Sequence, residues 1–367
     1  MSSTPAPARR GSYLFTGLLV VALVAAAGGY YLYERSKNPE PGPVDEFAAM
    51  KDYFRQLAAG PKLDPAYTDA DADLVADPPK TGRSLPLTSD KKQEVIGFSL
   101  VGTADEGRRK AEEAEWKDFT AALAKATGKK VEYRGDLEGT EEQMAAMKDN
   151  RLHVTAFNTG AVSRAVAGAG FVPLFAPADA AGKFGYQALI LVKADSPAQG
   201  LADLKGKTVA FVGLSSNSGA RVPMSALKEK AGLLPGRDYK YRISGDHYTA
   251  IADLIDGMAD AACVASDLKE RAFSSKFVAR GTSYEPKAEQ VRVVYTSDTF
   301  PPLCFGVSHD LPADVRGKVE AVFRDFKFAG TSAARPGREK FAPVSFKTDF
   351  QYVRDVDAAL GKLADVP

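Results

Sequence analysis

A run of hydroxyl and amide side chains, Ser215 to Ser218, separates an apolar segment from the start of a helix-like segment. Residues 208–212 have the apolar composition of a buried strand, and residues 224–228 favour a helix. The first N–H groups of a helix lack internal partners and the helix dipole is positive there, so such a turn can hold an anion. Ser and Asn are also the commonest helix caps. The turn alone therefore leaves two interpretations, an anion site and a helix cap.

Metal and redox chemistry have little support in the rest of the sequence. None of the three histidines is paired with another at metal-ligand spacing, and the two cysteines are not spaced as a metal knuckle; these residues are His153, His247, His309, Cys263 and Cys304. We expect neither a metal nor a cofactor. The sequence does not decide whether the two cysteines form a disulfide with each other.

The side-chain types of a nucleophilic triad are present in Ser216, His247 and Asp267. Residues 213–217 lack the G-x-S-x-G spacing of a nucleophile elbow, which marks one hydrolase fold. We therefore expect a binding protein rather than an enzyme.

Composition argues against nucleic acid as a partner. The chain has 367 residues, with 48 basic and 47 acidic side chains and a net charge of +1. Nucleic-acid binding needs a clustered basic excess, which this balance does not supply. The length suffices for one or two domains.

The N-terminal region predicts an exported chain. A short tail, residues 1–12, precedes an uncharged and mostly apolar run at 13–33, long enough to cross a hydrocarbon core of roughly 30 Å. A cleaved signal peptide and an uncleaved anchor are the alternatives, and the length of the run favours the anchor in the inner membrane. Residues 34–90 are rich in Pro and Asp and predict an extended spacer with one short helix at 45–57.

From residue 94 onward, strand-like and helix-like segments alternate, which predicts an α/β fold with mainly parallel sheets flanked by helices. Thr140 and Gln143 have the spacing of a capping box for the helix at 140–148, and Asp246 is placed to cap the helix at 247–256. The expected strands are 95–99, 130–133, 152–157, 209–212 and 261–265, and the expected helices are 110–127, 140–148, 223–231 and 247–256.

Two apolar runs, 187–193 and 291–295, flank the second half of this pattern. If both cross between lobes as a hinge, the chain forms two lobes with a cleft between them, and ligands in such folds bind at helix N-termini beyond the strand ends. The Ser216 turn and His247 both fall at such places. The expected division is lobe 1 at 91–193 and 294–367, and lobe 2 at 194–293.

Several short motifs, taken in this order and at these spacings, resemble the phosphonate- and phosphate-type solute-binding proteins of ABC transporters. They are Gly185-Tyr186 leading into 191–197, the segment 201–207, Ser216-Asn217-Ser218-Gly219 followed by Val222-Pro223, Gly245-Asp246-His247, the strand 291–297, and Leu311-Pro312. The resemblance implies the two-lobed type II periplasmic-binding-protein fold. It also implies capture of a small phosphorus oxyanion (phosphonate, phosphate or phosphite) for ABC-type uptake.

The resemblance also implies which residues bind. Side chains of the Ser216–Gly219 loop would hold the phosphoryl oxygens, with His247 and Tyr186 as further donors. Thr140 would either bind or cap its helix. Asp267 stands where related proteins face an amino group, although a helix cap fits it as well, and Leu303 replaces a second such acid, which argues against an aminoalkylphosphonate.

The implied partner is an ABC permease or a membrane sensor on the extracytoplasmic side. Two alternatives remain, an oxyanion sensor and a scaffold that has kept the fold but lost the ligand. The scaffold remains an alternative because Asn217, Thr140 and Leu303 depart from the family pattern.

Overall fold

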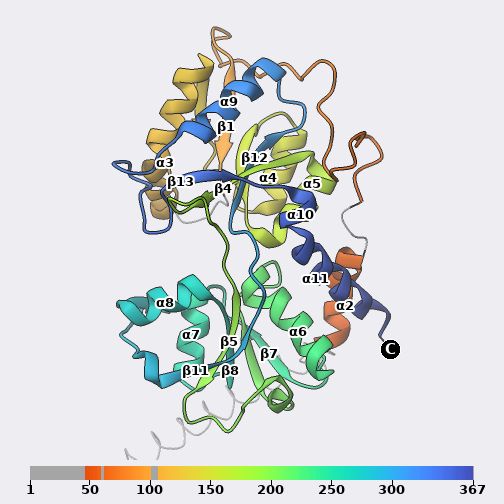
Figure 1. Cartoon of the computed structure of the whole chain (residues 1–367), viewed down its shortest axis with the longest axis vertical. Coiled ribbons are helices and arrows are strands. Elements are labelled where there is room, and N and C mark those ends of the chain that lie inside the picture. Colours follow the sequence, from red (N-terminus) through yellow and green to blue (C-terminus); the bar gives the residue numbers. More distant parts are fainter. Residues whose placement is uncertain (1–45, 59–61, 101–105, 367) are drawn as a thin grey trace, which may run out of the picture. The chain divides into compact units, whose positions relative to one another are not determined.

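The computed structural model describes residues 46–58, 62–100 and 106–366 (Figure 1). The chain divides into two units, 1–45 and 46–367, and the predicted tail and membrane segment lie outside the described residues. Within the described ranges, every helix is too short or too polar to cross a membrane.

The first lobe is built on a six-stranded sheet with the order β13-β4-β12-β3-β1-β2. Helices pack on this sheet, and the predicted apolar face of α3 is buried, with Trp116, Phe119 and Leu123 each 2% exposed or less. The elements are β1 (Val95–Ser99), α3 (Glu106–Thr127), β2 (Lys130–Tyr133), α4 (Thr140–Lys148), β3 (Val154–Phe157), α5 (Thr159–Ala169), β4 (Phe171–Ala178), β12 (Cys304–Ser308), α9 (Ala313–Asp325) and β13 (Lys340–Pro343).

The second lobe is built on a five-stranded sheet with the order β11-β5-β8-β6-β7, beside a small hairpin of β9 and β10. The α-helices and strands are β5 (Ala188–Lys193), β6 (Thr208–Phe211), α6 (Val222–Ala231), β7 (Lys240–Ile243), α7 (His247–Ile255), β8 (Ala261–Ala265), α8 (Ser266–Ser274), β9 (Phe277–Ala279), β10 (Thr282–Tyr284) and β11 (Val291–Thr296). Short helical turns are η1 (Leu201–Leu204), the π-helix η2 (Asn217–Arg221) and η3 (Ala288–Gln290).

Both sheets are mixed, so the prediction of mainly parallel sheets is wrong in that detail. The βαβ units pair in parallel, as expected: β1 with β2 and β3, and β6 with β7 and β8. The strands next to the lobe crossings pair antiparallel: β12 with β3 and β4, and β5 with β8 and β11. Such strands return from the other lobe instead of following a crossover helix, so the right-handed parallel connection does not apply to them.

The chain crosses between the lobes at 179–187 and 297–303. Tyr186 and Phe300 pair there through two backbone hydrogen bonds of 3.1 Å. The two apolar runs expected to cross, 187–193 and 291–295, lie instead within the second sheet as β5 and β11. The expected lobe boundaries at 193/194 and 293/294 therefore move to these two crossing segments.

Much of the predicted spacer belongs to the folded unit. The expected short helix forms as α2 (Glu46–Ala58) and packs against the C-terminal helix α11 (Gln351–Gly361), as Figure 1 shows. Its apolar positions, Phe47, Met50, Phe54 and Leu57, are each 4% exposed or less. Within 62–90, Val75 and Leu85 are buried. The remaining elements are α10 (Phe346–Asp349) and η4 (Lys362–Asp365).

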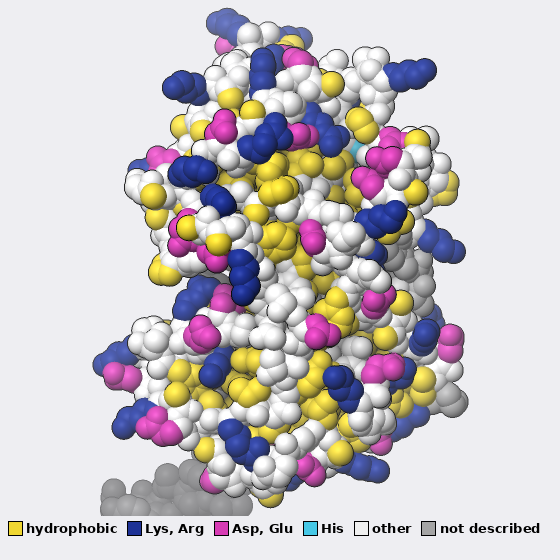
Figure 2. Space-filling view, in the orientation of Figure 1, with side chains coloured by type: hydrophobic (Ala, Val, Ile, Leu, Met, Phe, Trp, Pro, Cys, Tyr) yellow, Lys and Arg dark blue, Asp and Glu magenta, His cyan; other side chains and the backbone are white. Residues whose placement is uncertain are grey.

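The surface carries both signs of charge. Basic and acidic side chains are interspersed over the face shown in Figure 2, in keeping with the near-zero net charge.

Cys263 and Cys304 lie in different sheets, on β8 and β12, and both are free and buried. They form no disulfide, and burial raises the pKa of each thiol.

Candidate functional site

The hydroxyl-rich turn follows β6 and opens the helical segment η2–α6. Ser216 is the N-cap of η2, and its Oγ accepts a hydrogen bond of 3.1 Å from the Gly219 N–H. A Cβ atom at residue 219 would lie 2.5 Å from the Val212 side chain, so only glycine fits there. The cap interpretation is therefore confirmed for Ser216.

Asn217 has a different environment. Its side chain is 3% exposed, and neither its Nδ2 nor its Oδ1 has a hydrogen-bond partner among the described residues. An unpaired buried amide is costly, roughly 1–3 kcal/mol per group. Unsatisfied buried polar groups are uncommon in native proteins and call for a physical explanation. A group bound beside the amide would satisfy it.

A chain of hydroxyls connects the two lobes beside this turn. Thr159, at the start of α5, donates to the Pro301 carbonyl at 2.7 Å, so its Oγ1 can only accept from the Tyr186 hydroxyl at 3.2 Å. Ser218, which is 2% exposed, lies beside the Tyr186 hydroxyl and opposes the rise that burial causes in the pKa of that hydroxyl. Two predicted site residues are thus close together.

His247 is the first residue of α7. Asp246 caps this helix as expected, because its carboxylate accepts from the Thr249 N–H at 2.9 Å. The His247 Nδ1 accepts from the Ala265 N–H at 3.2 Å, so the ring proton is on Nε2. Burial lowers the pKa of His247 to about 4, against the opposing charges of Asp267 and Asp246. The ring is therefore neutral at pH 7 and can donate through Nε2.

Thr140 is the first residue of α4, whose N-cap is Gly139. The predicted capping box does not form, because the buried Gln143 amide donates instead to the Leu100 carbonyl at 2.6 Å and to Thr155 Oγ1 at 3.1 Å. Thr140 lies in the lining of the pocket between the lobes.

Asp267 is in the first turn of α8, but the N-cap of that helix is Ala265. Its exposed carboxylate pairs with Arg271 one turn along the helix. The cap interpretation of Asp267 is therefore wrong, and its carboxylate is engaged on the surface.

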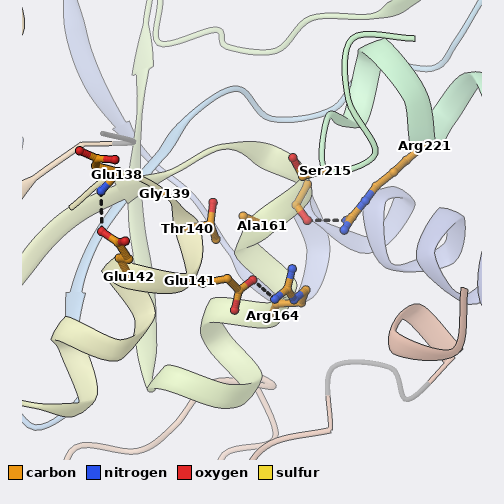
Figure 3. Close-up of a pocket in the computed structure, with 10 residues that line it drawn as sticks. Glu138, Gly139, Thr140, Glu141, Glu142, Ala161, Arg164, Ser215 and Arg221 are labelled. Atoms are coloured by element: carbon orange, nitrogen blue, oxygen red, sulfur yellow. Dashed lines mark hydrogen bonds and ion pairs between the residues drawn. The ribbon is translucent and has the colours of Figure 1, made fainter. Parts of the chain in front are cut away.

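A pocket of about 380 Å³ lies between the lobes. The first turns of α4 and α5 line it from the first lobe, and two residues around the Ser216 turn line it from the second (Figure 3). Of the predicted site residues, only Thr140 is in the lining, a statement that covers the residues the structure describes. The lining consists of Glu138, Gly139, Thr140, Glu141, Glu142, Gly160, Ala161, Arg164, Ser215 and Arg221.

Arg221 is the site residue that sequence reasoning misplaced. From its place one turn into the helix after Ser216, Arg221 could approach the ligand or lie on the surface, and the sequence favours the surface. It is instead 1% exposed and lines the pocket. Its Nη1 donates to the Gly160 carbonyl and pairs with Asp357 at 3.0 Å, and its Nε donates to the Tyr53 hydroxyl at 2.7 Å. Its Nη2 is buried without a partner among the described residues.

One sequence signal could have placed Arg221 inside. It stands between Ala220 and the Val222-Pro223 pair with no other charge within the turn, and a charged residue in a buried apolar run is expected to be paired. Its partner Asp357 is itself buried. Burial raises the pKa of Asp357 to about 6, and the Arg221 guanidinium opposes that rise.

Two lobes joined by two crossing segments, with a polar pocket between them, define a solute-binding protein of the two-lobed type II periplasmic fold. The family model for the periplasmic substrate-binding protein of phosphonate ABC transporters matches residues 106–350. The chain belongs to this family. It is therefore a substrate-binding transport component rather than an enzyme, and its place is extracytoplasmic.

Solved structures share this fold at low identity. A binding-protein component of an ABC phosphonate transporter from Pseudomonas aeruginosa is 18% identical, with a TM-score of 0.58 over 74% of this chain and 88% of that one. A Prochlorococcus marinus protein in complex with methylphosphonate is 14% identical, with a TM-score of 0.58 over 73% and 98%. A Xanthomonas citri protein bound to ATP is 17% identical, with a TM-score of 0.59 over 74% and 98%.

Proposed function

We propose that this protein captures a small phosphorus oxyanion in the inter-lobe cleft, with the Ser216–Gly219 loop at the centre of the site. The supporting observation is Asn217, at the start of a helical segment, whose buried amide nitrogen and oxygen have no partner in the described part of the chain. A phosphoryl oxygen beside Nδ2 supplies the missing acceptor, and a protonated oxygen supplies a donor for Oδ1.

The other expected ligand residues complete the set in this proposal. The Nε2–H of His247 donates to a second oxygen. Ser218 and Tyr186 donate from their hydroxyls to the ligand. Thr140 contributes its hydroxyl from the first lobe, and Asp267 remains outside the first contacts because Arg271 engages it. Neutral donors of this kind can hold an oxyanion without a full countercharge.

We further propose that residues 13–33 anchor the protein to the inner membrane and that an ABC permease receives the ligand. The apolar run is long enough for the membrane, and an anchored binding protein stays close to its permease. A membrane sensor is the alternative partner, since lobe closure can be reported as well as transferred.

A ligand-free scaffold is the competing function. The hydrogen bond between Tyr186 and Thr159 favours it, because these hydroxyls are satisfied without a ligand. The two functions differ in the consequence of replacing Asn217, whose amide is unsatisfied unless a ligand is present.

The test is Asn217→Leu, which keeps a similar volume and removes both amide atoms. We expect methylphosphonate affinity to fall at least tenfold by calorimetry, while the free energy of unfolding without ligand stays equal or rises. Asn158→Leu is the control, since Asn158 caps α5 by accepting from Ala161 N–H at 3.0 Å, and its loss should cost about 1 kcal/mol of stability. Absence of binding by methylphosphonate, phosphate and phosphite in the unmodified chain would favour the scaffold.

A further inference from the structure

The N-terminus of α4 is uncapped where it meets the pocket. Its N-cap is Gly139, and among the described residues no side chain accepts a hydrogen bond from the N–H groups of the first turn. The first backbone bond into the helix is from Gln143 N–H to the Gly139 carbonyl at 3.0 Å. The N–H groups of Thr140, Glu141 and Glu142 precede that bond, so the pocket meets unpaired donors at the positive end of a helix dipole.

A second group in the same pocket also lacks an acceptor. Arg221 lines the pocket from the opposite lobe, is 1% exposed, and has a buried Nη2 without a partner among the described residues. Its other nitrogens are engaged by Tyr53, Gly160 and Asp357. Those bonds hold the guanidinium in place, so Nη2 is a fixed donor rather than a mobile one.

The acidic side chains at the start of α4 are already engaged. Glu141 pairs with Arg164, and Glu142 accepts from the Glu138 N–H at 2.8 Å; Figure 3 shows both contacts directed away from Thr140. The Glu138 Oε1 atom lies 3.8 Å from the Arg109 Nη1 atom. Among the described residues, the backbone N–H groups of the first turn of α4 and Arg221 Nη2 are the donors without an acceptor at this end of the pocket.

The pocket next to the Ser216–Gly219 loop has room for part of a ligand that reaches beyond its phosphoryl group. A water molecule occupies about 30 Å³ of liquid, so a volume of about 380 Å³ corresponds to roughly a dozen waters. A substituent that extends from the phosphorus atom toward α4 has room within it.

We propose that the first turn of α4 and Arg221 form a second anion subsite, so that the ligand class is a phosphonate bearing a second anionic group, such as a phosphonocarboxylate. This inference rests on the proposed function: the phosphoryl group binds at the Ser216–Gly219 loop, and the second anion accepts from the α4 N–H groups and Arg221 Nη2. Arg221 becomes a specificity-determining residue.

The experiment compares methylphosphonate and phosphonoacetate, with 2-aminoethylphosphonate as a third probe, by calorimetry on the full chain in detergent. We expect phosphonoacetate to bind at least tenfold more tightly. Gly139→Asp then places a carboxylate on the same donors, since an N-cap Asp accepts from the first-turn N–H groups. The extended backbone of Gly139 (φ 171°) and the open space around its Cβ position admit the side chain. In this variant we expect the affinity ratio of the two probes to fall below threefold.

Gly200→Asp is the matched control, because Gly200 also precedes a helical turn with open space at its Cβ position and does not line the pocket. Its affinity ratio should equal that of the unmodified chain. Equal affinities for the two probes, tighter binding of 2-aminoethylphosphonate than of phosphonoacetate, or an unchanged ratio in Gly139→Asp would overturn the second subsite while leaving phosphonate binding intact. Absence of binding by all three probes would remove the proposed function, and this inference with it.

Discussion

Individual side chains in the cleft differ in whether the protein itself satisfies them. Ser216 caps its helix, and Tyr186 bonds Thr159, whereas Asn217 and one nitrogen of Arg221 have no hydrogen-bond partner among the described residues. Satisfied groups contribute to the ligand-free fold, and a ligand must replace their bonds. Unsatisfied groups cost stability without a ligand, so they gain most from binding.

His247 gives a prediction at this scale. Its pKa is lowered to about 4 in the folded chain, while an unfolded histidine has a pKa of about 6.5. The unfolded state therefore binds more protons, and stability is lost as pH falls from about 6.5 toward 4. We expect His247→Gln to reduce that loss by about 1–3 kcal/mol, measured as the difference between urea unfolding at pH 7.5 and pH 4.5.

His153 supplies the control for this measurement. Burial also lowers its pKa to about 4, and it lies at the base of β3, where its Nδ1 accepts from the Gly97 N–H at 2.9 Å. Because His153 is unchanged in the variant, part of the acid-induced loss must persist. A pH dependence of stability identical to that of the unmodified chain would show that the pKa of His247 is the same in the folded and unfolded states.

The sequence predicted the polar loop because its residues are contiguous, and it misplaced Arg221 because the partners of that residue are not. Asp357 and Tyr53 are 136 and 168 residues away along the chain. A local pattern shows that an arginine follows a turn, but the burial of its charge depends on pairing that only the folded chain provides.

At the scale of elements, the close approach of α5 to the Ser216 turn depends on Gly160. A Cβ atom there would lie 2.4 Å from the Ser215 carbonyl oxygen and 3.4 Å from both Arg221 Nη1 and Asn217 N. The lobes therefore touch directly through backbone at this point.

Gly160→Ala should push the two elements apart. We expect a stability loss of about 1–3 kcal/mol, typical of overpacking, together with weaker binding of methylphosphonate. Gly168→Ala is the control on the same helix, since a Cβ there meets nothing within 4 Å, and it should stabilise the chain by up to about 1 kcal/mol. Equal effects of the two substitutions in thermal unfolding would contradict the close contact.

Element types followed from the sequence, whereas their capping and pairing followed only in part. The predicted strand at 95–99 and the helix at 140–148 are observed with those bounds. The capping box at Thr140 fits the local motif, yet Gln143 finds acceptors in the sheet at Leu100 and Thr155. Local spacing predicts where a helix begins, but a buried side chain takes whichever partner the tertiary fold offers.

At the scale of the whole described unit, the segment between the N-terminal run and the first strand proved hardest to predict. Its proline and aspartate content is typical of a linker. Loop 62–90 nevertheless hydrogen-bonds the first lobe, where Asp64 N–H donates to the Ala167 carbonyl at 2.8 Å and Arg83 N–H donates to the Asp310 carbonyl at 2.7 Å. Composition records average polarity, whereas attachment depends on a few apolar residues and backbone bonds.

The packing of α2 leads to a prediction that tests whether this helix is part of the folded unit or only a linker. Phe54 is fully buried on the face of α2 that packs with α11, so Phe54→Ala should cost about 3–5 kcal/mol of unfolding free energy. Asp52→Ala, on the exposed side of the same helix, should change stability by less than about 0.5 kcal/mol. Urea unfolding followed by tryptophan fluorescence reports this directly, because the single Trp116 lies in the first lobe. If α2 were only a linker, both variants would unfold at the midpoint of the unmodified chain. Because Tyr53 on α2 also bonds Arg221 in the pocket, loss of this packing should weaken methylphosphonate binding as well, which a linker could not do.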